Sequence, residues 1–407
     1  MAQPIAPVTI QGRYFWKSNE RFILNGVVYH HHNSHMPLSC VDMLVDDRIE
    51  ELERAIPLLK DLNINTLFVN HISETRSHAA CMNLLAENGI HVIVSIESIC
   101  HSSETNTHMQ SYTPNTMYRY FQAIDKLASY PNLLGFVVSN DLIKDSRSAI
   151  LGPIIRAVVR DIRRYIALLA AKKRQRVVPV GVLAMDIRSI EQQFDYFCSG
   201  DDSETIDFFL FNNLTWGPES TMQTSGYSKL VESFSQVHVP VSFMYGRRRA
   251  QPWQFNETRA LYSDPGMLRV FSGGIVFDFL NNIRHGLVRR STRPEDGSVR
   301  YKKQTDFRNL RESLNQSFSR IPPSLLVRTR VCVAGAMSGI KPDPPISTRN
   351  GLIIGPAPPS PVDWTEVGTQ IIDDSDWVDA GKEWLDISVE DLAISMWDRL
   401  NIDGINP

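Results

Sequence analysis

Eight short runs rich in apolar and β-branched residues recur between Phe22 and Phe277. They occupy residues 22–29, 66–69, 91–94, 136–142, 177–182, 206–211, 240–243 and 274–277. Segments with a helical spacing of apolar residues separate several of them, at residues 47–62, 74–88, 116–129 and 150–171. Short buried strands that alternate with helices predict an α/β fold, a parallel sheet closed into a (β/α)8 TIM barrel. In such a barrel the chemistry lies at the C-terminal ends of the strands.

The sequence beyond the predicted barrel divides into two further parts. The barrel itself is expected to fill residues 1–325, ending with a helix at about 304–320. Residues 326–372 are rich in proline, which predicts an extended linker packed on the barrel. Residues 373–407 are acidic and carry an apolar helical stripe at 384–400. That amphipathic helix either docks on the outside of the barrel or forms a homo-oligomer or partner contact.

Composition and charge exclude several classes of protein. Hydrophobic residues make up 43% and charged residues 21%, as in an ordinary globular protein, and the net charge of -3 gives no reason to expect nucleic acid. No stretch is long and apolar enough to cross a membrane, and the N-terminus lacks the pattern of a secretory signal. The cysteines are few, odd in number and unclustered, which fits reduced thiols. We therefore expect a cytoplasmic protein without a nucleic-acid or membrane partner.

Polar side chains gather at the predicted strand tips, but the carboxylates there are unevenly placed. The fourth run ends in Asn140 and Asp141, whereas the seventh ends in Met244, Tyr245 and Arg247 and has no acid. The tips of the first three runs carry His30, His32, Asn70, His71, Ser95 and Glu97. Because histidine titrates nearest neutrality, Asp141 paired with a histidine would make an acid/base couple.

Simpler roles are open for several of these residues. The histidine run could bind a metal, but neighbours on a strand face opposite sides, so at most His30 and His32 converge. We expect neither a metal nor another cofactor. His71 could cap the following helix or satisfy a loop carbonyl, and Glu97 could pair with an arginine such as Arg247.

Several collinear stretches carry a resemblance to a known family. They are residues 26–29, 56–65, 160–166, 196–202, 224–227, 272–276 and 286–288, within a region from about Val8 to Pro323. Together they resemble the fungal β-1,3-glucanosyltransferases of glycoside hydrolase family 72. The resemblance implies a barrel and a secreted, disulfide-held enzyme that cuts β-1,3-glucan by a retaining mechanism and rejoins the fragment to another chain. That chemistry needs two facing carboxylates, a proton donor and a nucleophile.

The chain departs from that family at the residues that matter most. The resemblance places the proton donor on Asp141, after Asn140, and the nucleophile on Met244, whose thioether cannot form a glycosyl ester. Other polar family positions fall on His30, Phe68, Asn70, Ser95, Leu214 and Asn281, while Tyr29, Asn140, Asn212 and Trp216 keep the family type. Family disulfide positions fall on Leu52, Ser199 and Gly217.

These departures favour a re-purposed barrel that is not a glucan transferase. Phe68, Leu214 and Met244 suit a partly apolar small-molecule substrate better than a sugar. The leading hypothesis is a cytosolic cyclase, lyase or isomerase of fungal secondary-metabolite biosynthesis. Its catalytic residues would be Asp141, His30 and Glu97, and its substrate-binding residues Tyr29, His32, Asn70, His71, Ser95, Asn140, Asn212, Leu214, Trp216, Met244, Tyr245 and Phe277.

Two alternatives to that hypothesis are kept. One is a non-catalytic carbohydrate-binding pseudoenzyme that uses Trp216 and Tyr29 as sugar platforms. The other is residual glucanosyltransferase or glucanase activity, with a different nucleophile or an inverting water.

Overall fold

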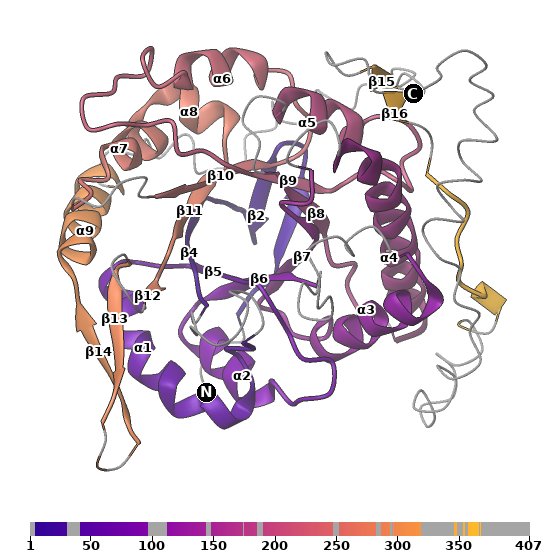
Figure 1. Ribbon diagram of the computed structural model, residues 1–407, viewed down its shortest axis with the longest axis horizontal. Coiled ribbons are helices and arrows are strands. Elements are labelled where there is room, and N and C mark those ends of the chain that lie inside the picture. Colours follow the sequence, from indigo (N-terminus) through magenta and orange to yellow (C-terminus); the bar gives the residue numbers. More distant parts are fainter. Residues whose placement is uncertain are drawn as a thin grey trace.

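The computed structural model describes residues 5–30, 41–96, 112–143, 148–173, 175–184, 190–246, 252–281, 286–293, 295, 297–318, 346–347, 353–354, 357–365 and 367. Eight parallel strands close into a barrel in the order β10-β11-β4-β5-β6-β7-β8-β9 (Figure 1). They are β4 (Leu24–Val28), β5 (Thr66–Val69), β6 (His91–Ser95), β7 (Leu133–Asn140), β8 (Val180–Ala184), β9 (Phe208–Asn212), β10 (Val241–Gly246) and β11 (Gly273–Phe277). The predicted (β/α)8 barrel is confirmed.

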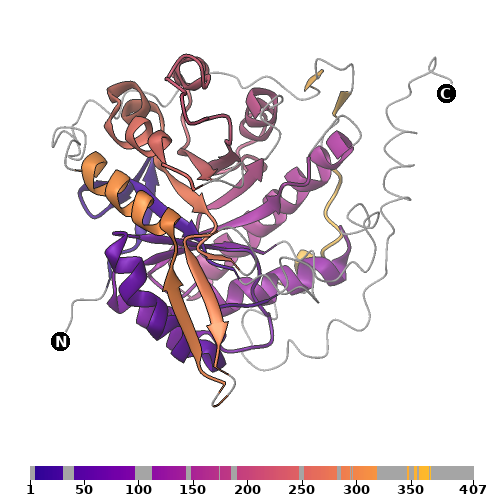
Figure 2. The same ribbon diagram turned by 60° about the vertical axis from the view of Figure 1, so that its left-hand side comes forward.

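Helices surround this ring of strands (Figure 1). They are α1 (Ile49–Asp61), α2 (Ala79–Glu87), α3 (Pro114–Leu127), α4 (Gly152–Lys173), α5 (Ile190–Cys198), α6 (Tyr227–Ser233), α7 (Asn256–Ser263), α8 (Pro265–Val270) and α9 (Thr305–Phe318). A hairpin of β13 (Val288–Thr292) and β14 (Val299–Lys303) lies against α1 (Figure 2). Arg290 of the hairpin donates two hydrogen bonds of 3.0 Å to the Glu51 carboxylate of α1, which fixes this contact.

The barrel wall separates two hydrophobic cores, because successive side chains of a strand face opposite sides. Along β9, Phe208 and Leu210 belong to the interior core, whereas Phe209 and Phe211 belong to the larger core between strands and helices. Side-chain direction at a regular strand tip follows from this period, whereas the register of β7 against β8 shifts between Val137 and Asn140.

A small N-terminal sheet closes one end of the barrel. Its antiparallel strands are β1 (Val8–Gln11), β2 (Tyr14–Lys17) and β3 (Glu20–Phe22), and β2 is visible behind the centre of the ring in Figure 1. Val8 and Phe15 belong to the interior core, and the Phe15 ring lies 5.9 Å from that of Phe208. The sequence did not predict this sheet.

Phe208 fills the barrel interior because its neighbours lack side chains. A Cβ added at Gly181 would lie 2.5 Å from the Phe208 carbonyl oxygen and 2.6 Å from its ring. A Cβ at Gly135 would lie 2.7 Å from the same ring. These glycines on β7 and β8 are therefore required by packing around one aromatic ring.

Part of the proline-rich segment packs on the barrel's helices. Arg160 of α4 donates a 2.8 Å hydrogen bond to the Pro358 carbonyl oxygen, and the Ser360 hydroxyl donates a 2.7 Å bond to buried Asp161. The Trp364 ring lies 5.9 Å from the Phe121 ring of α3. Beyond residue 318 the structure describes only this part and the short strands β15 (Ile346–Ser347) and β16 (Ile353–Ile354). The predicted helix at 384–400 lies outside the described residues.

Two further sequence expectations concern thiols and membranes. Cys81 is a buried thiol whose pKa is raised by burial to about 12, and Cys198 is also buried. Across the described parts of the chain, no helix has both the length and the hydropathy that a membrane span needs.

A buried carboxyl lies in the first turn of α7. Glu257 is 2% exposed, and burial raises its pKa to about 7 although the Trp253 indole donates a 2.5 Å hydrogen bond to it. The folded protein therefore holds this group protonated at acidic pH, where the unfolded chain has already released the proton.

The packing around Phe208 predicts that Gly181→Ala lowers the free energy of unfolding by about 1–3 kcal/mol, because the added methyl group overpacks the interior. Combining it with Phe208→Leu should cost less than the sum of the two single changes, by about 1 kcal/mol, since the smaller side chain makes room. Urea denaturation of the three variants measures this. Strict additivity would contradict the proposed contact.

Burial of Glu257 predicts that the free energy of unfolding depends on pH, and that Glu257→Gln removes this dependence. Because the folded pKa of about 7 lies above the ordinary 4.5, the contribution of this group to stability falls as pH rises between these values and is constant outside them. The free energy of unfolding of the wild type, relative to the variant, should fall by about 3 kcal/mol across that window. Urea denaturation at several pH values tests this, with Glu87→Gln on α2 as a control for the lost charge. A difference independent of pH would contradict it.

Candidate active site

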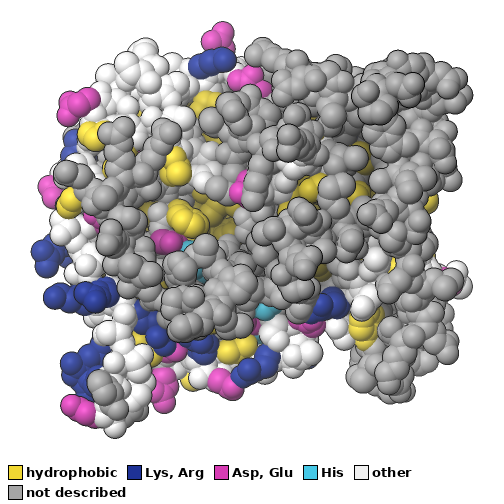
Figure 3. Space-filling view, in the orientation of Figure 1, with side chains coloured by type: hydrophobic (Ala, Val, Ile, Leu, Met, Phe, Trp, Pro, Cys, Tyr) yellow, Lys and Arg dark blue, Asp and Glu magenta, His cyan; other side chains and the backbone are white. Residues whose placement is uncertain are grey.

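The C-terminal ends of the strands place a ring of polar groups over an apolar layer. Phe68 and Met244 belong to the interior core and are 0% and 4% exposed. By the same alternation Asn70 and Ser95 face the interior beyond that layer, and Asn212 stands level with Met244 in the strand register. Figure 3 shows this face, with hydrophobic and histidine side chains visible near its centre. We call this region the barrel mouth.

Asn140 and Asp141 stand at the tip of β7, as the sequence predicted. The Asn140 side-chain amide donates a 3.4 Å hydrogen bond to Oδ1 of Asn70, which links the tips of β7 and β5. Between them, at the tip of β6, the Ser95 hydroxyl is buried and has no hydrogen-bond partner among the described residues. Asp141 adopts a φ of 63° and its N–H donates a 3.1 Å bond to the Leu183 carbonyl oxygen. This left-handed conformation, which Asp tolerates, turns the chain at the strand end.

A histidine and an aspartate pair on another wall of the mouth. His30 follows β4, and its Nδ1 lies 2.9 Å from Oδ1 of Asp278, which follows β11. The His30 side chain is 5% exposed, and the ring of Phe277, itself 49% exposed, lies 5.7 Å from the imidazole. Sequence reasoning missed Asp278. The available signal was a carboxylate one residue beyond the eighth predicted strand.

The strand order places these two groups on opposite sides of the mouth. β7 is separated from β11 by three strands in either direction around the closed barrel. The tip of β7, which Asp141 follows, therefore lies across the barrel axis from the tip of β11, which Asp278 follows. His30, which Asp278 contacts, follows the neighbouring strand β4.

The tip of β10 carries no acid in its described residues. Met244 pairs in register with Asn212 of β9 and Ile275 of β11, and its side chain lies in the interior core. The position that the family resemblance assigns to the nucleophile is thus occupied by a thioether. Since a thioether forms no glycosyl ester, the retaining double displacement has no nucleophile at β10.

Tyr29 and Tyr245 do not lie where the sequence placed them. Both belong to the outer core, between the strands and the helices. The Tyr29 ring lies 5.8 Å from Phe279, and burial raises the pKa of both tyrosines well above 10. Their placement does not agree with the prediction that they contact substrate at the mouth, because each is one residue out of phase with the inward-facing positions.

The other predicted site residues are only partly brought together. Leu214 and His71 are half-buried in the segments after β9 and β5, and Trp216 packs edge-on against Tyr227 with ring centres 4.9 Å apart, in the outer core. His32, Glu97 and Arg247 lie outside the described residues. Within the described residues, no cluster of three or more His, Cys, Asp or Glu side chains could hold a metal ion.

Comparison with known proteins identifies the family. The glucanosyltransferase family model matches residues 1–317. The 1,3-beta-glucanosyltransferase gel1 of Aspergillus fumigatus is 32% identical over 286 residues, which are 70% of this chain and 61% of that protein. The 1,3-beta-glucanosyltransferase GAS5 of Saccharomyces cerevisiae is 34% identical over 316 residues, which are 76% of this chain and 62% of that protein.

Solved structures agree with this result. The structure of Saccharomyces cerevisiae Gas2p in complex with laminaritriose and laminaritetraose is 30% identical, with a TM-score of 0.68, and the match covers 77% of this chain and 69% of that one. The chain spans about three fifths of the length of the curated relatives named above. On these matches the chain belongs to the glucanosyltransferase family, glycoside hydrolase family 72.

Proposed function

We propose that the barrel mouth binds a β-1,3-glucan oligosaccharide and cleaves it by a single displacement. One observation carries this proposal: Asp141 stands across the mouth from the His30–Asp278 pair, while Met244 occupies the place of the nucleophile. Inverting glycosidases need an acid on one side of the scissile bond and a base on the other, and no covalent intermediate.

The choice of a glucan substrate is supported by the family and by the polar ring. Gas2p, which is similar over most of this chain, was solved with laminaritriose and laminaritetraose. The side-chain amides of Asn70, Asn140 and Asn212 can donate to and accept from sugar hydroxyls. Oδ1 of the Asn212 side chain is buried and has no hydrogen-bond partner among the described residues, so it can accept from a bound hydroxyl.

The roles of the charged groups follow from their placement. Asp141 donates a proton to the glycosidic oxygen as the bond between that oxygen and the anomeric carbon breaks. A water attacks the anomeric carbon from the opposite side and gives its proton to Nε2 of His30. Asp278, whose Oδ1 lies 2.9 Å from Nδ1, stabilises by its negative charge the imidazolium that forms. One water is consumed, and the new reducing end has the inverted configuration.

A second candidate function rests on the apolar layer under the polar ring. Phe68 and Met244 present hydrocarbon and thioether surface to the mouth, which suits a partly apolar small molecule. The same acid/base groups would then serve a cytosolic cyclase, lyase or isomerase. Product analysis after incubation with laminaritetraose separates the two candidates, because only a glucan-active barrel cleaves it.

The mechanism predicts that Asp141→Asn and His30→Gln each slow cleavage of reduced laminari-oligosaccharides by about 10²-fold or more, because each removes one proton transfer. The affinity of each variant for the oligosaccharide should change little. Timed chromatography of the products gives the rate, and calorimetry gives the affinity. Tyr245→Phe is the control, since that hydroxyl lies outside the barrel interior. Equal turnover in both variants, or a wild type that does not cleave, would overturn the proposal.

The missing nucleophile predicts a gain of function. Met244→Glu combined with Asp141→Glu supplies carboxylates of full length at both positions that the family resemblance assigns to catalysis. Oligosaccharides longer than the substrate should then appear, because a covalent intermediate can be passed to a second sugar. Mass spectrometry of the products detects them, and Met244→Gln with Asp141→Glu is the matched control. A folded double variant without such products would show that β10 is not the site of the lost nucleophile.

A further inference from the structure

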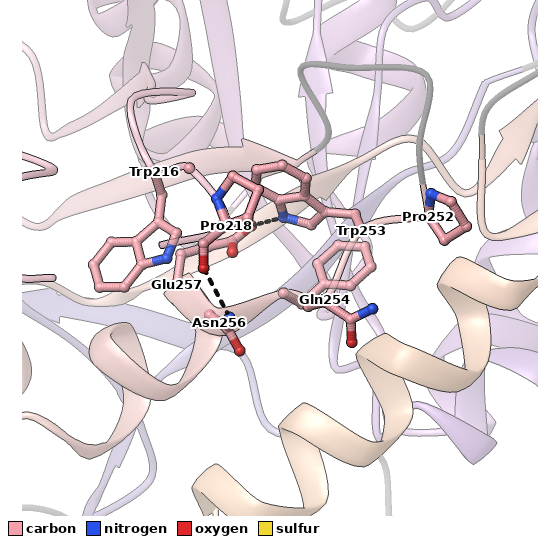
Figure 4. A pocket seen from close by; sticks show the side chains of 9 residues that line it. Trp216, Pro218, Pro252, Trp253, Gln254, Asn256 and Glu257 are labelled. Atoms are coloured by element: carbon pink, nitrogen blue, oxygen red, sulfur yellow. Dashed lines mark hydrogen bonds between the residues drawn. The ribbon is translucent and has the colours of Figure 1, made fainter. Parts of the chain in front are cut away.

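A second cavity lies beside the barrel mouth, between the segment that follows β9 and the start of α7 (Figure 4). Its volume is about 370 Å3, and its lining includes Trp216, Pro218, Pro252, Trp253, Asn256 and Glu257. A cavity of this size holds a small ligand such as one sugar ring. None of these residues, apart from Trp216, belongs to the predicted site.

Hydrogen bonds to the neighbouring helix hold one wall of the cavity in place. The Trp253 N–H donates a 3.0 Å bond to Asp306 of α9, and the Trp253 carbonyl oxygen accepts a 2.8 Å bond from Asn309 of the same helix. Asn256 donates a 3.5 Å bond to the Pro218 carbonyl oxygen and so joins this wall to the opposite one. The cavity is therefore built before any ligand enters.

Two buried polar atoms of the lining have no hydrogen-bond partner among the described residues. They are Oε2 of Glu257, whose other oxygen accepts the 2.5 Å bond from Trp253, and Nε1 of Trp216. The two residues are 2% and 8% exposed. Buried polar groups are nearly always hydrogen-bonded. A molecule bound in the cavity can supply the partners of these two atoms.

The lining combines flat apolar surfaces with a few hydrogen-bonding groups. Two indole rings and two proline rings suit the C–H faces of a pyranose, and Trp216 Nε1 and Glu257 Oε2 suit its hydroxyls. An organic cation can stack on indole rings, but a buried positive charge is best compensated by a charged carboxylate. Burial raises the pKa of Glu257 to about 7, so this group offers no stable negative charge near neutrality. A neutral ligand therefore fits better.

We propose that the cavity between Trp216 and Trp253 is a second saccharide-binding site, which takes one pyranose unit of a neutral glycan. The choice of β-1,3-glucan as that glycan rests on the proposed function. Because β9 and β10 are adjacent and lead into the two walls, the cavity opens on the same side of the barrel as the mouth. The site would hold a glycan without acting on it, since the described residues of its lining include a single carboxyl.

Calorimetric titration of the full chain with laminaritriose tests the proposal. The wild type should bind two molecules of laminaritriose. In Trp253→Ala the affinity of the cavity should be at least about tenfold weaker, so that one of the two sites is lost from the titration. Trp216→Ala should do the same by removing the other ring. Trp364→Ala, which removes a tryptophan on the far α3–α4 side, is the matched control and should keep both sites. Thermal unfolding of each variant shows that it is folded.

The possible failures are distinguishable. If the wild type binds one laminaritriose and both Trp253→Ala and Trp216→Ala still bind it, the cavity is not a saccharide site. The proposed function would be unaffected by this result. A single site that both variants lose, and Asp141→Asn retains, would support the cavity and contradict the proposed function. Glu257→Gln should keep laminaritriose binding, because the amide preserves the hydrogen bonds. Binding of tetramethylammonium without laminaritriose would overturn the neutral-ligand assignment.

Discussion

The alternation of side chains along β10 decides which chemistry the barrel mouth can carry. The Tyr245 ring lies outside the barrel, where Gly274 leaves room: a Cβ there would lie 2.7 Å from the ring. The Tyr262 hydroxyl fixes the same region by donating a 2.7 Å bond to the Leu24 carbonyl oxygen and accepting a 3.1 Å bond from the Gly274 N–H. Because a slip of one residue would turn every side chain of the strand over, this packing holds Met244 inside.

The inward direction of Met244 affects both the stability of the barrel interior and the reactive groups that the mouth presents. A carboxylate at this position would have to stay ionised next to apolar residues, which costs free energy unless it is paired. Methionine has no such cost and extends the interior core to the strand tip, where burying its side chain contributes about 1.5–3 kcal/mol. Titratable side chains then stand on other walls of the mouth, with Asp141 at the tip of β7 and His30 and Asp278 beyond β4 and β11.

The sequence predicted the fold well because short apolar strands and amphipathic helices carry clear periods. It missed the β1–β3 sheet, whose short strands mix apolar and charged residues and depend on the barrel end for their burial. Asn140 and Asp141 were predicted because they follow an apolar run. The outward direction of Tyr29 and Tyr245 depends on strand phase, and the His30–Asp278 pair depends on β11 lying beside β4. The available signals were the two-residue period of each strand and the closure of the barrel between its first and eighth strands.

The most direct test of catalysis without a covalent intermediate is the configuration of the first product. Proton NMR during cleavage of a reduced laminari-oligosaccharide resolves the α and β anomers of the new reducing end before they equilibrate. A single displacement on a β-linked glucan predicts that the α anomer forms first. Initial release of the β anomer, or transfer products longer than the substrate, would contradict it and require a nucleophile in the wild-type mouth.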